Sequence, residues 1–294
     1  MRPAHLPTRA EDLIPHRAGM LLIRDLCAWE IGRARASAEI TEHNVFLNPA
    51  GELESEALVE LMAQTAAAYK GYKRLSEGRT FRFGYLAGIR QINITNQVGA
   101  GDSIIIAVHQ EIEIDKASVM HGIVQREGDK VAEGALKIWE EDSFPVERGS
   151  LPEKPWGINP TKNKDELKYS EKSRICRSLM DCLCKIDVSH ENSSATGEFL
   201  LAENFIGFDG HFPGIPILPG VIVLSAARLM AEEVCKAPLF LKGIENAKFM
   251  IPVFPGDRIR VEVRIQPQSE YLQIHGRLMK EDRACASVLL RAGV

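Results

Sequence analysis

The sequence GHFPGIPILPGVIVLSAARLM, residues 210–230, joins a loop rich in proline and glycine to an apolar helix. His211 stands at the start of the loop, and an imidazole there suits proton transfer because its ordinary pKa lies near neutrality. The helix is predicted to begin at Pro219-Gly220, where free backbone N–H groups can polarise a carbonyl oxygen and glycine allows a ligand to approach closely. The stretch predicts either an acid–base site or a structural histidine in a rigid turn. It contains no carboxylate partner for His211.

The chain around this stretch repeats itself. Residues 85–108, YLAGIRQINITNQVGAGDSIIIAV, align with residues 240–263, FLKGIENAKFMIPVFPGDRIRVEV. The Gly-Ile pairs and the Gly-Asp pairs of these two segments are both 155 residues apart. Because order and spacing are both kept, the sequence predicts two copies of one fold.

The sequence of each copy predicts an apolar helix followed by the strands of an antiparallel sheet. Residues 257–265, DRIRVEVRI, alternate charged and apolar side chains, which is typical of a half-buried strand, and residues 101–114 are their counterpart. The helix predicted over residues 54–74 is apolar on nearly every side between Ala57 and Tyr69, so we expect it to be buried. Turn signals between the strands favour an antiparallel sheet around one helix, an α+β fold.

The segment between the copies, residues 142–166, is rich in proline, glycine and charge, and we interpret it as a linker. The chain then divides into an N-terminal domain at 1–141 and a C-terminal domain at 167–294. Fully extended, such a linker spans about 80 Å, enough to carry the chain around a partner domain.

Composition argues against several classes of protein. The net charge of −4 disfavours binding of nucleic acid through phosphate neutralisation. No apolar run reaches the roughly 18 residues of a membrane span, and the N-terminus lacks the apolar core of a signal peptide, so we expect a cytoplasmic protein. The six cysteines lack the paired spacing of a zinc site, and we expect reduced thiols, no metal and no other cofactor.

Glu60 is an unusual residue of the helix predicted over residues 54–74. It lies one turn inside, among apolar side chains, whereas Glu54 and Glu56 are explained as helix-start acids favoured by the helix dipole. A buried carboxyl group is costly unless paired or protonated, so we expect burial to raise the pKa of Glu60, as in a general acid. The alternative is that Glu60 points outward at a helix edge. Gln64 follows one turn later on the same face.

The segment GHFPGIPILPGV resembles the signature of the 3-hydroxyacyl-acyl-carrier-protein dehydratases of fatty-acid synthesis, which have the hotdog fold. The likeness continues through residues 240–263. In that family, the loop histidine and a Glu or Asp fourteen residues later carry the chemistry. The matching residues here are His211 and Ser225, so the C-terminal half lacks its acid.

The N-terminal half resembles the same family in LIPHRAGMLLIRD and in LVELMAQTAA, where Glu60 matches the acid. It lacks the HFPG loop, and Ala50-Gly51 stands where the histidine is expected. His16 matches a residue of the family motif that is not catalytic, and we interpret it as structural. This half is most similar to the dehydratase-like partner proteins of aryl-polyene-type pathways.

The two halves thus lack complementary residues. The family's active site forms at a dimer interface, with the histidine from one protomer and the acid from the other. The resemblance therefore implies a tandem double hotdog, an intrachain pseudo-dimer, with one composite site made by His211 and Glu60. The mirror site, in which Ser225 faces the region of Ala50, is expected to be inactive.

The resemblance implies dehydration of a 3-hydroxyacyl thioester to a trans-2-enoyl thioester, carried on the phosphopantetheine of an acyl carrier protein. His211 would take the proton at C2, Glu60 would protonate or position the departing 3-hydroxyl, and the Gly220 N–H would polarise the thioester carbonyl. The residues expected to contact the substrate are Phe212, Pro213, Gly214, Pro219, Val221 and Gln64. Five basic residues could dock the carrier protein or form an ordinary solvated surface: Lys70, Lys73, Arg74, Arg79 and Arg82.

Three other functions remain in view. A hotdog thioesterase would use Glu60 to activate water, although the HFPG loop argues against it. A non-catalytic subunit that binds carrier protein would have decayed from a dehydratase, although decay does not favour complementary losses. A nucleophilic pair of Ser225 and His211 ranks last, because no Gly-x-Ser-x-Gly elbow is present. Acyl chain length, pathway and assembly beyond the pseudo-dimer are left open.

Overall fold

The computed structural model describes residues 5–79, 82–141 and 169–294. The N-terminal half contains β1 (Thr8–Arg9), β2 (Asp25–Glu30), β3 (Arg33–Glu39), α1 (Ala57–Ser76), β4 (Phe83–Ile94), β5 (Ser103–Ile114), β6 (Ala117–Arg126) and β7 (Asp129–Glu141). The C-terminal half contains α2 (Arg174–Asp181), β8 (Leu183–Ser189), β9 (Ser194–Leu200), α3 (Gly220–Cys235), β10 (Phe240–Phe249), β11 (Arg258–Pro267), β12 (Leu272–Lys280) and β13 (Arg283–Gly293). The linker predicted at 142–166 lies outside the described residues.

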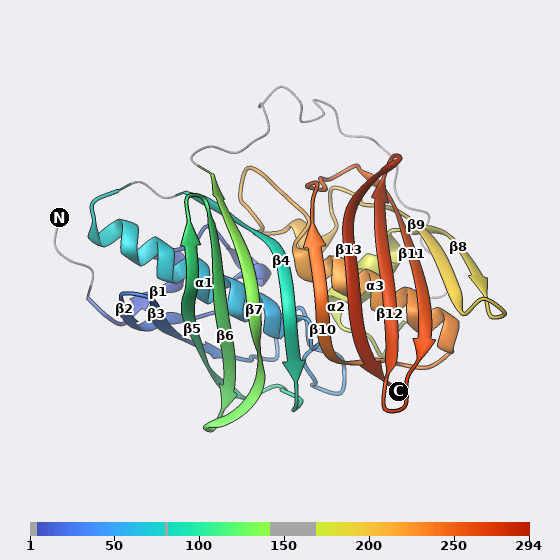
Figure 1. Ribbon diagram of the computed structural model, residues 1–294, viewed down its shortest axis with the longest axis horizontal. Coiled ribbons are helices and arrows are strands. Elements are labelled where there is room, and N and C mark those ends of the chain that lie inside the picture. Colours follow the sequence, from blue (N-terminus) through green and yellow to red (C-terminus); the bar gives the residue numbers. More distant parts are fainter. Residues whose placement is uncertain (1–4, 80–81, 142–168) are drawn as a thin grey trace.

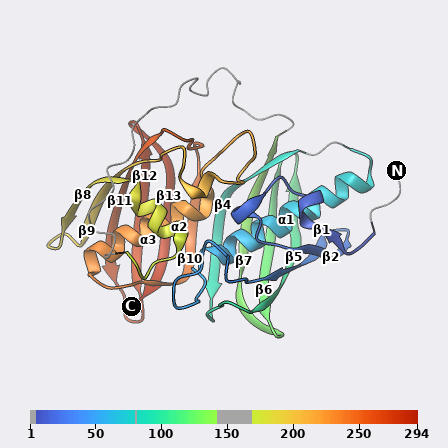
Figure 2. The ribbon, with the colours of Figure 1, turned by 180° about the vertical axis from the view of Figure 1, so that it is seen from behind.

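The two halves repeat one architecture, which confirms the predicted tandem double hotdog. In each half a long helix is followed by four antiparallel strands, β4 to β7 after α1 and β10 to β13 after α3. Within the described residues the strands form one antiparallel sheet of 13 strands, in the order β1-β2-β3-β5-β6-β7-β4-β10-β13-β12-β11-β9-β8. Figures 1 and 2 show α1 and α3 on the same side of this sheet.

The expectation that each copy begins with its helix is wrong. Three strands, β1 to β3, precede α1, and two strands, β8 and β9, precede α3. They lie toward the outer ends of the sheet. Four consecutive residues of β8 are exposed, so its sequence lacks the alternation that marks β11. An edge strand with one solvated side gives a weak periodic signal.

Burial follows the predicted patterns in strand β11 and helix α1. In β11 the buried side chains Ile259, Val261 and Val263 alternate with charged residues. The helix α1 is buried from Ala57 through Tyr69 except at Ala63 and Ala67. These two alanines face a cavity, which is why the otherwise buried helix shows a second, partly exposed face.

The halves join through the pairing of β4 with β10, where Gly88 faces Lys248 and Asn93 faces Gly243. A side chain at Gly88 would place its Cβ 2.8 Å from the carbonyl oxygen of Ala247. Gly88 and Gly243 are the glycines of the repeated Gly-Ile pairs. The repeat therefore marks the backbone approach that joins the two copies into one sheet. Among the described residues, no helix is both long and apolar enough to cross a membrane.

Candidate active site

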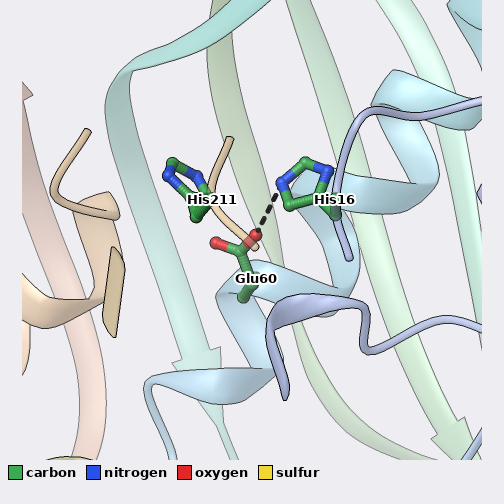
Figure 3. Close-up of side chains that lie close together, drawn as sticks. All are labelled: His16, Glu60 and His211. Carbon is green, nitrogen blue, oxygen red and sulfur yellow. Dashed lines mark ion pairs between the residues drawn. The ribbon is translucent and has the colours of Figure 1, made fainter. Parts of the chain in front are cut away.

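His211 and Glu60 meet in a cavity of about 680 Å³ at the junction of the two halves. Glu60 projects from the first turn of α1, and His211 lies in the loop that leads to α3. Figure 3 shows the carboxylate of Glu60 between the rings of His211 and His16. The structure therefore brings together the histidine of one half and the acid of the other.

His211 is oriented by its own loop. Its Nδ1 lies 2.9 Å from the carbonyl oxygen of Ile217, which can only accept, so we assign the ring proton to Nδ1. The lone pair of Nε2 then remains for proton abstraction. Burial and repulsion from His16 lower the pKa of His211 to about 4, although Glu60 acts in the opposite direction. The ring is consequently neutral at pH 7, the form that a general base requires.

The expected raised pKa of Glu60 is wrong. Burial does raise the pKa of this carboxyl group, but the hydrogen bond and charge of His16, the charge of His211 and the hydrogen bond of Gln64 together lower it. Gln64 Nε2 donates to Glu60 Oε1 at 2.9 Å, and His16 Nε2 lies 3.4 Å from the same oxygen. Glu60 is therefore a buried carboxylate with dedicated donors, and it does not point outward at a helix edge.

His16 is a site residue that sequence reasoning placed in a structural role. Its side chain is 7% exposed and contacts Glu60 directly. The ring also packs edge-on against His211, with centroids 5.1 Å apart, and against Phe212, with centroids 4.9 Å apart. A signal was present in the sequence, because His16 and its neighbour Arg17 are the polar residues of the segment 14–20, whose other residues are apolar or glycine.

The loops that carry the two histidines are tied together by backbone contacts. Arg17 N donates to the carbonyl oxygen of Gly210 at 3.0 Å. Gly210 has a φ of 86°, and a side chain there would collide with the Arg17 carbonyl. Glycine is therefore required at this position for both conformation and space. The spacing between His16 and His211 is fixed by this contact.

Gly220 begins α3, as predicted, and lines the cavity. The first backbone N–H groups of a helix have no acceptor within the helix, so they are available to an oxyanion. A Cβ at Gly220 would lie 3.1 Å from the ring of Phe249 and 3.3 Å from Leu86. The missing side chain keeps the path to this helix end open.

Only some of the residues expected to contact the substrate line the cavity. Phe212 lines the cavity. Pro213, Gly214, Pro219 and Val221 do not lie among its lining residues, and Val221 is buried in the core.

Gln64 is also absent from the residues that line the cavity, so its expected contact with substrate stays a prediction. Its side chain donates to Met20 and Glu60, and accepts from the backbone of Leu22. Sequence reasoning missed a row of small lining residues on α1, Ala63, Ala67 and Gly71.

The basic residues near the end of α1 are engaged in ion pairs. Lys70 pairs with Glu140 at 2.7 Å and with Glu113 at 3.1 Å, and Lys73 pairs with Glu113 at 3.3 Å. Arg74 lies 3.6 Å from Glu140. Arg79 pairs with Glu77 at 3.2 Å. Arg82 lines the cavity. The paired carboxylates weaken this surface as a docking site for an acidic protein.

A second junction between the two halves repeats the backbone contact of the first, with the roles of the halves exchanged. On the first side, Arg17 N donates to the carbonyl that precedes His211. On the second side, Ile175 N donates at 3.0 Å to the carbonyl of Val45, which precedes Phe46. Phe46 therefore occupies the position that corresponds to His211.

The expectation that Ala50-Gly51 replaces the histidine is thus wrong by a few residues. Phe46 precedes Glu60 by fourteen residues, as His211 precedes Ser225. Ser225 is 1% exposed and donates to the Val221 carbonyl within its own helix. Since Ser225 is absent from the cavity lining, it does not form a nucleophilic pair with His211.

Charged side chains fill the second junction. Arg228 of α3 donates to Glu56 and Glu54 of the N-terminal half, each at 2.7 Å, and to Glu232 at 2.8 Å. Lys172 pairs with the second oxygen of Glu232 at 2.7 Å. Arg228 is 3% exposed and Glu56 is fully buried. Glu54 and Glu56 are therefore partners of a cross-domain arginine, and the view of them as helix-start acids is incomplete.

His16, Glu60 and His211 also form a possible metal-ligand set, with ligand atoms within 4.8 Å of one another. A tetrahedral zinc ion with bonds of about 2.1 Å holds its ligand atoms about 3.4 Å apart. The three side chains would have to close in to hold an ion. Among the described cysteines all are free, three of them buried.

Two protein-family models match the chain in tandem. The model described as ApeP dehydratase, of the ApeP-like family, matches residues 8–147. The model described as ApeI dehydratase, of the ApeI-like family, matches residues 187–288. Glu60 lies within the first match and His211 within the second.

Curated relatives and solved structures extend these matches. The 3-hydroxyacyl-[acyl-carrier-protein] dehydratase FabZ of Legionella pneumophila (strain Lens) is 39% identical over 102 residues, which cover 31% of this chain and 67% of the relative. The enzyme of the same name from Rickettsia massiliae (strain Mtu5) is 35% identical over 125 residues, which cover 37% of this chain and 84% of the relative.

Two solved structures share the fold over most of the chain. The dehydratase domain from the CurF module of Curacin polyketide synthase matches with a TM-score of 0.55 at 12% identity, over 95% of this chain and 99% of that chain. A putative oleoyl thioesterase from Lactobacillus plantarum matches with a TM-score of 0.58 at 11% identity, over 88% of this chain and 95% of that chain. At such identities the likeness shows the fold alone.

Proposed function

Because this chain belongs to the 3-hydroxyacyl-[acyl-carrier-protein] dehydratase family of hydro-lyases, we propose that it removes water from 3-hydroxyacyl thioesters at one composite site. The observation that carries the proposal is the meeting of His211 and Glu60, from different halves, in one cavity. At the second junction, Phe46 and Ser225 stand in their places and cannot transfer a proton in the same way.

The positions of Gly220, Glu60 and His211 predict how the substrate is oriented in the site. The thioester carbonyl at C1 would accept a hydrogen bond from the backbone N–H of Gly220 at the start of α3. The 3-hydroxyl would donate to the Glu60 carboxylate. The hydrogen on C2, between these two contacts, then faces Nε2 of His211. The helix end stabilises the enolate-like charge that develops as this proton leaves.

The lowered pKa of Glu60 favours a positioning role over that of a proton donor. His211 takes the proton from C2, and the electron pair of the C2–H bond forms the C2=C3 double bond as the C3–O bond breaks. The imidazolium returns the same proton to the departing hydroxyl, which leaves as water. The neutral imidazole and the carboxylate are regenerated, so the cycle needs no other reactant.

We propose that the acyl group arrives on an acyl carrier protein, as the names of the relatives state for those enzymes. The test is incubation of the purified chain with 3-hydroxyacyl carrier proteins of several acyl lengths, followed by mass spectrometry of the acyl-phosphopantetheine. Loss of one water from the acyl group supports dehydration. Release of free acid with unacylated carrier protein would indicate a thioesterase. Binding of carrier protein without turnover would indicate a non-catalytic subunit.

A further inference from the structure

His16 approaches one oxygen of Glu60, and no side chain among the described residues hydrogen-bonds to the other. His16 Nε2 and Gln64 Nε2 both lie at Oε1, at 3.4 Å and 2.9 Å. In Figure 3, the second oxygen of Glu60 lies on the side of His211. Two donors on a single oxygen fix the rotation of a carboxylate, and they direct the remaining lone pairs of the other oxygen toward the cavity.

The contacts of His16 show which of its ring nitrogens faces Glu60. Its Nδ1 is buried and has no partner among the residues that the structure describes. A proton on Nε2 lets this nitrogen donate to Glu60, in agreement with the hydrogen bond and charge of His16 that lower the pKa of Glu60. Arg17 supports this orientation, because its guanidinium donates to the carbonyl oxygens of Ile14 and His16 at 2.7 Å and 2.6 Å.

We propose that His16 is a positioning residue, which holds Glu60 as an oriented carboxylate and presents Oε2 to the 3-hydroxyl of the substrate. This inference rests on the proposed dehydration. It assigns the site three contributors instead of two, with His16 acting through Glu60 and not on the substrate itself. The other titratable or charged groups near this pair are His211, from the loop before α3, and Arg17, from the segment of His16.

Two substitutions separate this role from simple packing. His16→Phe keeps an aromatic ring against His211 and Phe212 but removes the donor. His16→Gln loses the ring but keeps an N–H at nearly the place of Nε2. We expect His16→Phe to lower kcat by about 10- to 100-fold, the effect of one charge-assisted hydrogen bond, with KM little changed. We expect His16→Gln to retain most of the wild-type kcat.

The pH profile gives a second readout. Without the His16 donor, burial dominates at Glu60 and its pKa rises, so the acid limb of kcat/KM moves to higher pH in His16→Phe, and it moves less far in His16→Gln, which keeps a donor. The proposal is overturned if His16→Phe keeps the wild-type kcat and pH profile. It is also overturned if His16→Phe is active and His16→Gln is not, because that pattern indicates packing.

A measurement without turnover separates this proposal from the proposed function. Carbon-13 NMR of a chain labelled at glutamate carboxyl carbons follows the ionisation of Glu60, with its signal assigned by Glu60→Gln. We expect Glu60 to ionise at higher pH in His16→Phe than in wild type, and an unchanged titration overturns the role of His16. If the wild-type chain dehydrates no 3-hydroxyacyl group on a carrier protein, the proposed function is contradicted. The titration of Glu60 still shows whether His16 lowers its pKa.

Discussion

Glu60 and Ser225 stand at matching positions in α1 and α3, yet their surroundings give them opposite chemistry. Glu60 has His16 and Gln64 as donors and opens onto the cavity beside His211. Ser225 is closed into its own helix by its hydrogen bond to Val221. The same helix position therefore places a carboxylate at the cavity in one half and a hydroxyl bonded within its own helix in the other.

The pKa of His211 predicts an unusual acid tolerance. Burial and His16 lower it to about 4, so the neutral base persists well below the pH at which an ordinary histidine becomes protonated. We expect kcat/KM to stay level from pH 7 to about pH 5, and to fall below that as His211 becomes protonated. The measurement is the pH profile of kcat/KM on a 3-hydroxyacyl carrier protein.

Folding must be followed alongside this profile. Because the folded state holds His211 with a lowered pKa, the unfolded chain binds more protons between about pH 4 and pH 6.5, and the free energy of unfolding falls as the pH drops through this window. Circular dichroism at each pH separates unfolding from protonation of the base. An acid limb centred near pH 6.5 in a folded chain would show that the environment of His211 is not as described.

At the scale of single residues, the sequence predicts which residues form the site better than it predicts what surrounds each of them. The HFPG loop and the helix position of Glu60 are local patterns, so His211, Glu60 and Gly220 could be named from the sequence. The pKa of Glu60 could not, because His16 and Gln64 approach it only after folding. A motif position does not reveal which side chain it will face.

At the scale of elements, the cavity follows one face of α1. Ala63, Ala67 and Gly71 form a path of small residues that begins beside Glu60. At about 1.5 Å per residue, Gly71 lies about 16 Å along the helix from Glu60. A substrate with C1 at Gly220 and C3 at Glu60 would direct its acyl chain along this face, and Figure 2 shows α1 running outward from the junction of the halves.

Filling this path should shorten the acyl chains that the protein accepts. We expect Ala67→Leu to lower kcat/KM for a long-chain 3-hydroxyacyl carrier protein, because its isobutyl group would occupy the groove beyond C3. A four-carbon substrate, which ends before Ala67, serves as the internal control and should react as with wild type. Equal losses on both substrates would show that the acyl chain does not follow α1.

The strands show how far periodicity alone can go. The alternation in β11 and its counterpart β5 predicts both strands, since each buries one face against a helix. The strands β2 and β8 escape prediction because their residues are mostly exposed or only partly buried. Elements that complete a sheet at its ends carry less of the hydrophobic pattern than those at its centre.

At the scale of the whole molecule, the two junctions have diverged into different tasks. The first holds the cavity, and the second holds Arg228 with its three glutamates. Both lie between the same two halves. The family resemblance and the internal repeat predict this pseudo-dimer from the sequence, but the cross-domain ion pairs could not be predicted, because Arg228 and Glu56 are 172 residues apart.

The buried ion pairs should contribute strongly to stability. Arg228→Met removes the cation and leaves Glu54 and Glu56 buried without their partner, which costs about 3–5 kcal/mol in the free energy of unfolding. Arg260→Met is the matched control, because Arg260 pairs with Glu262 at 2.8 Å on the surface and such pairs contribute about 0–1 kcal/mol. Urea denaturation measures both. A similar loss in the free energy of unfolding for both variants would contradict the view that the ion pairs of Arg228 stabilise the second junction.

The most direct test of a single composite site compares Glu60→Gln, His211→Ala and Ser225→Ala in one dehydration assay. The two helix variants are matched, because Glu60 and Ser225 occupy equivalent positions in α1 and α3. We expect Glu60→Gln and His211→Ala to lose about 10²-fold or more in kcat, and Ser225→Ala to keep the wild-type rate. Retained activity in Glu60→Gln, or its loss in Ser225→Ala, would contradict the account.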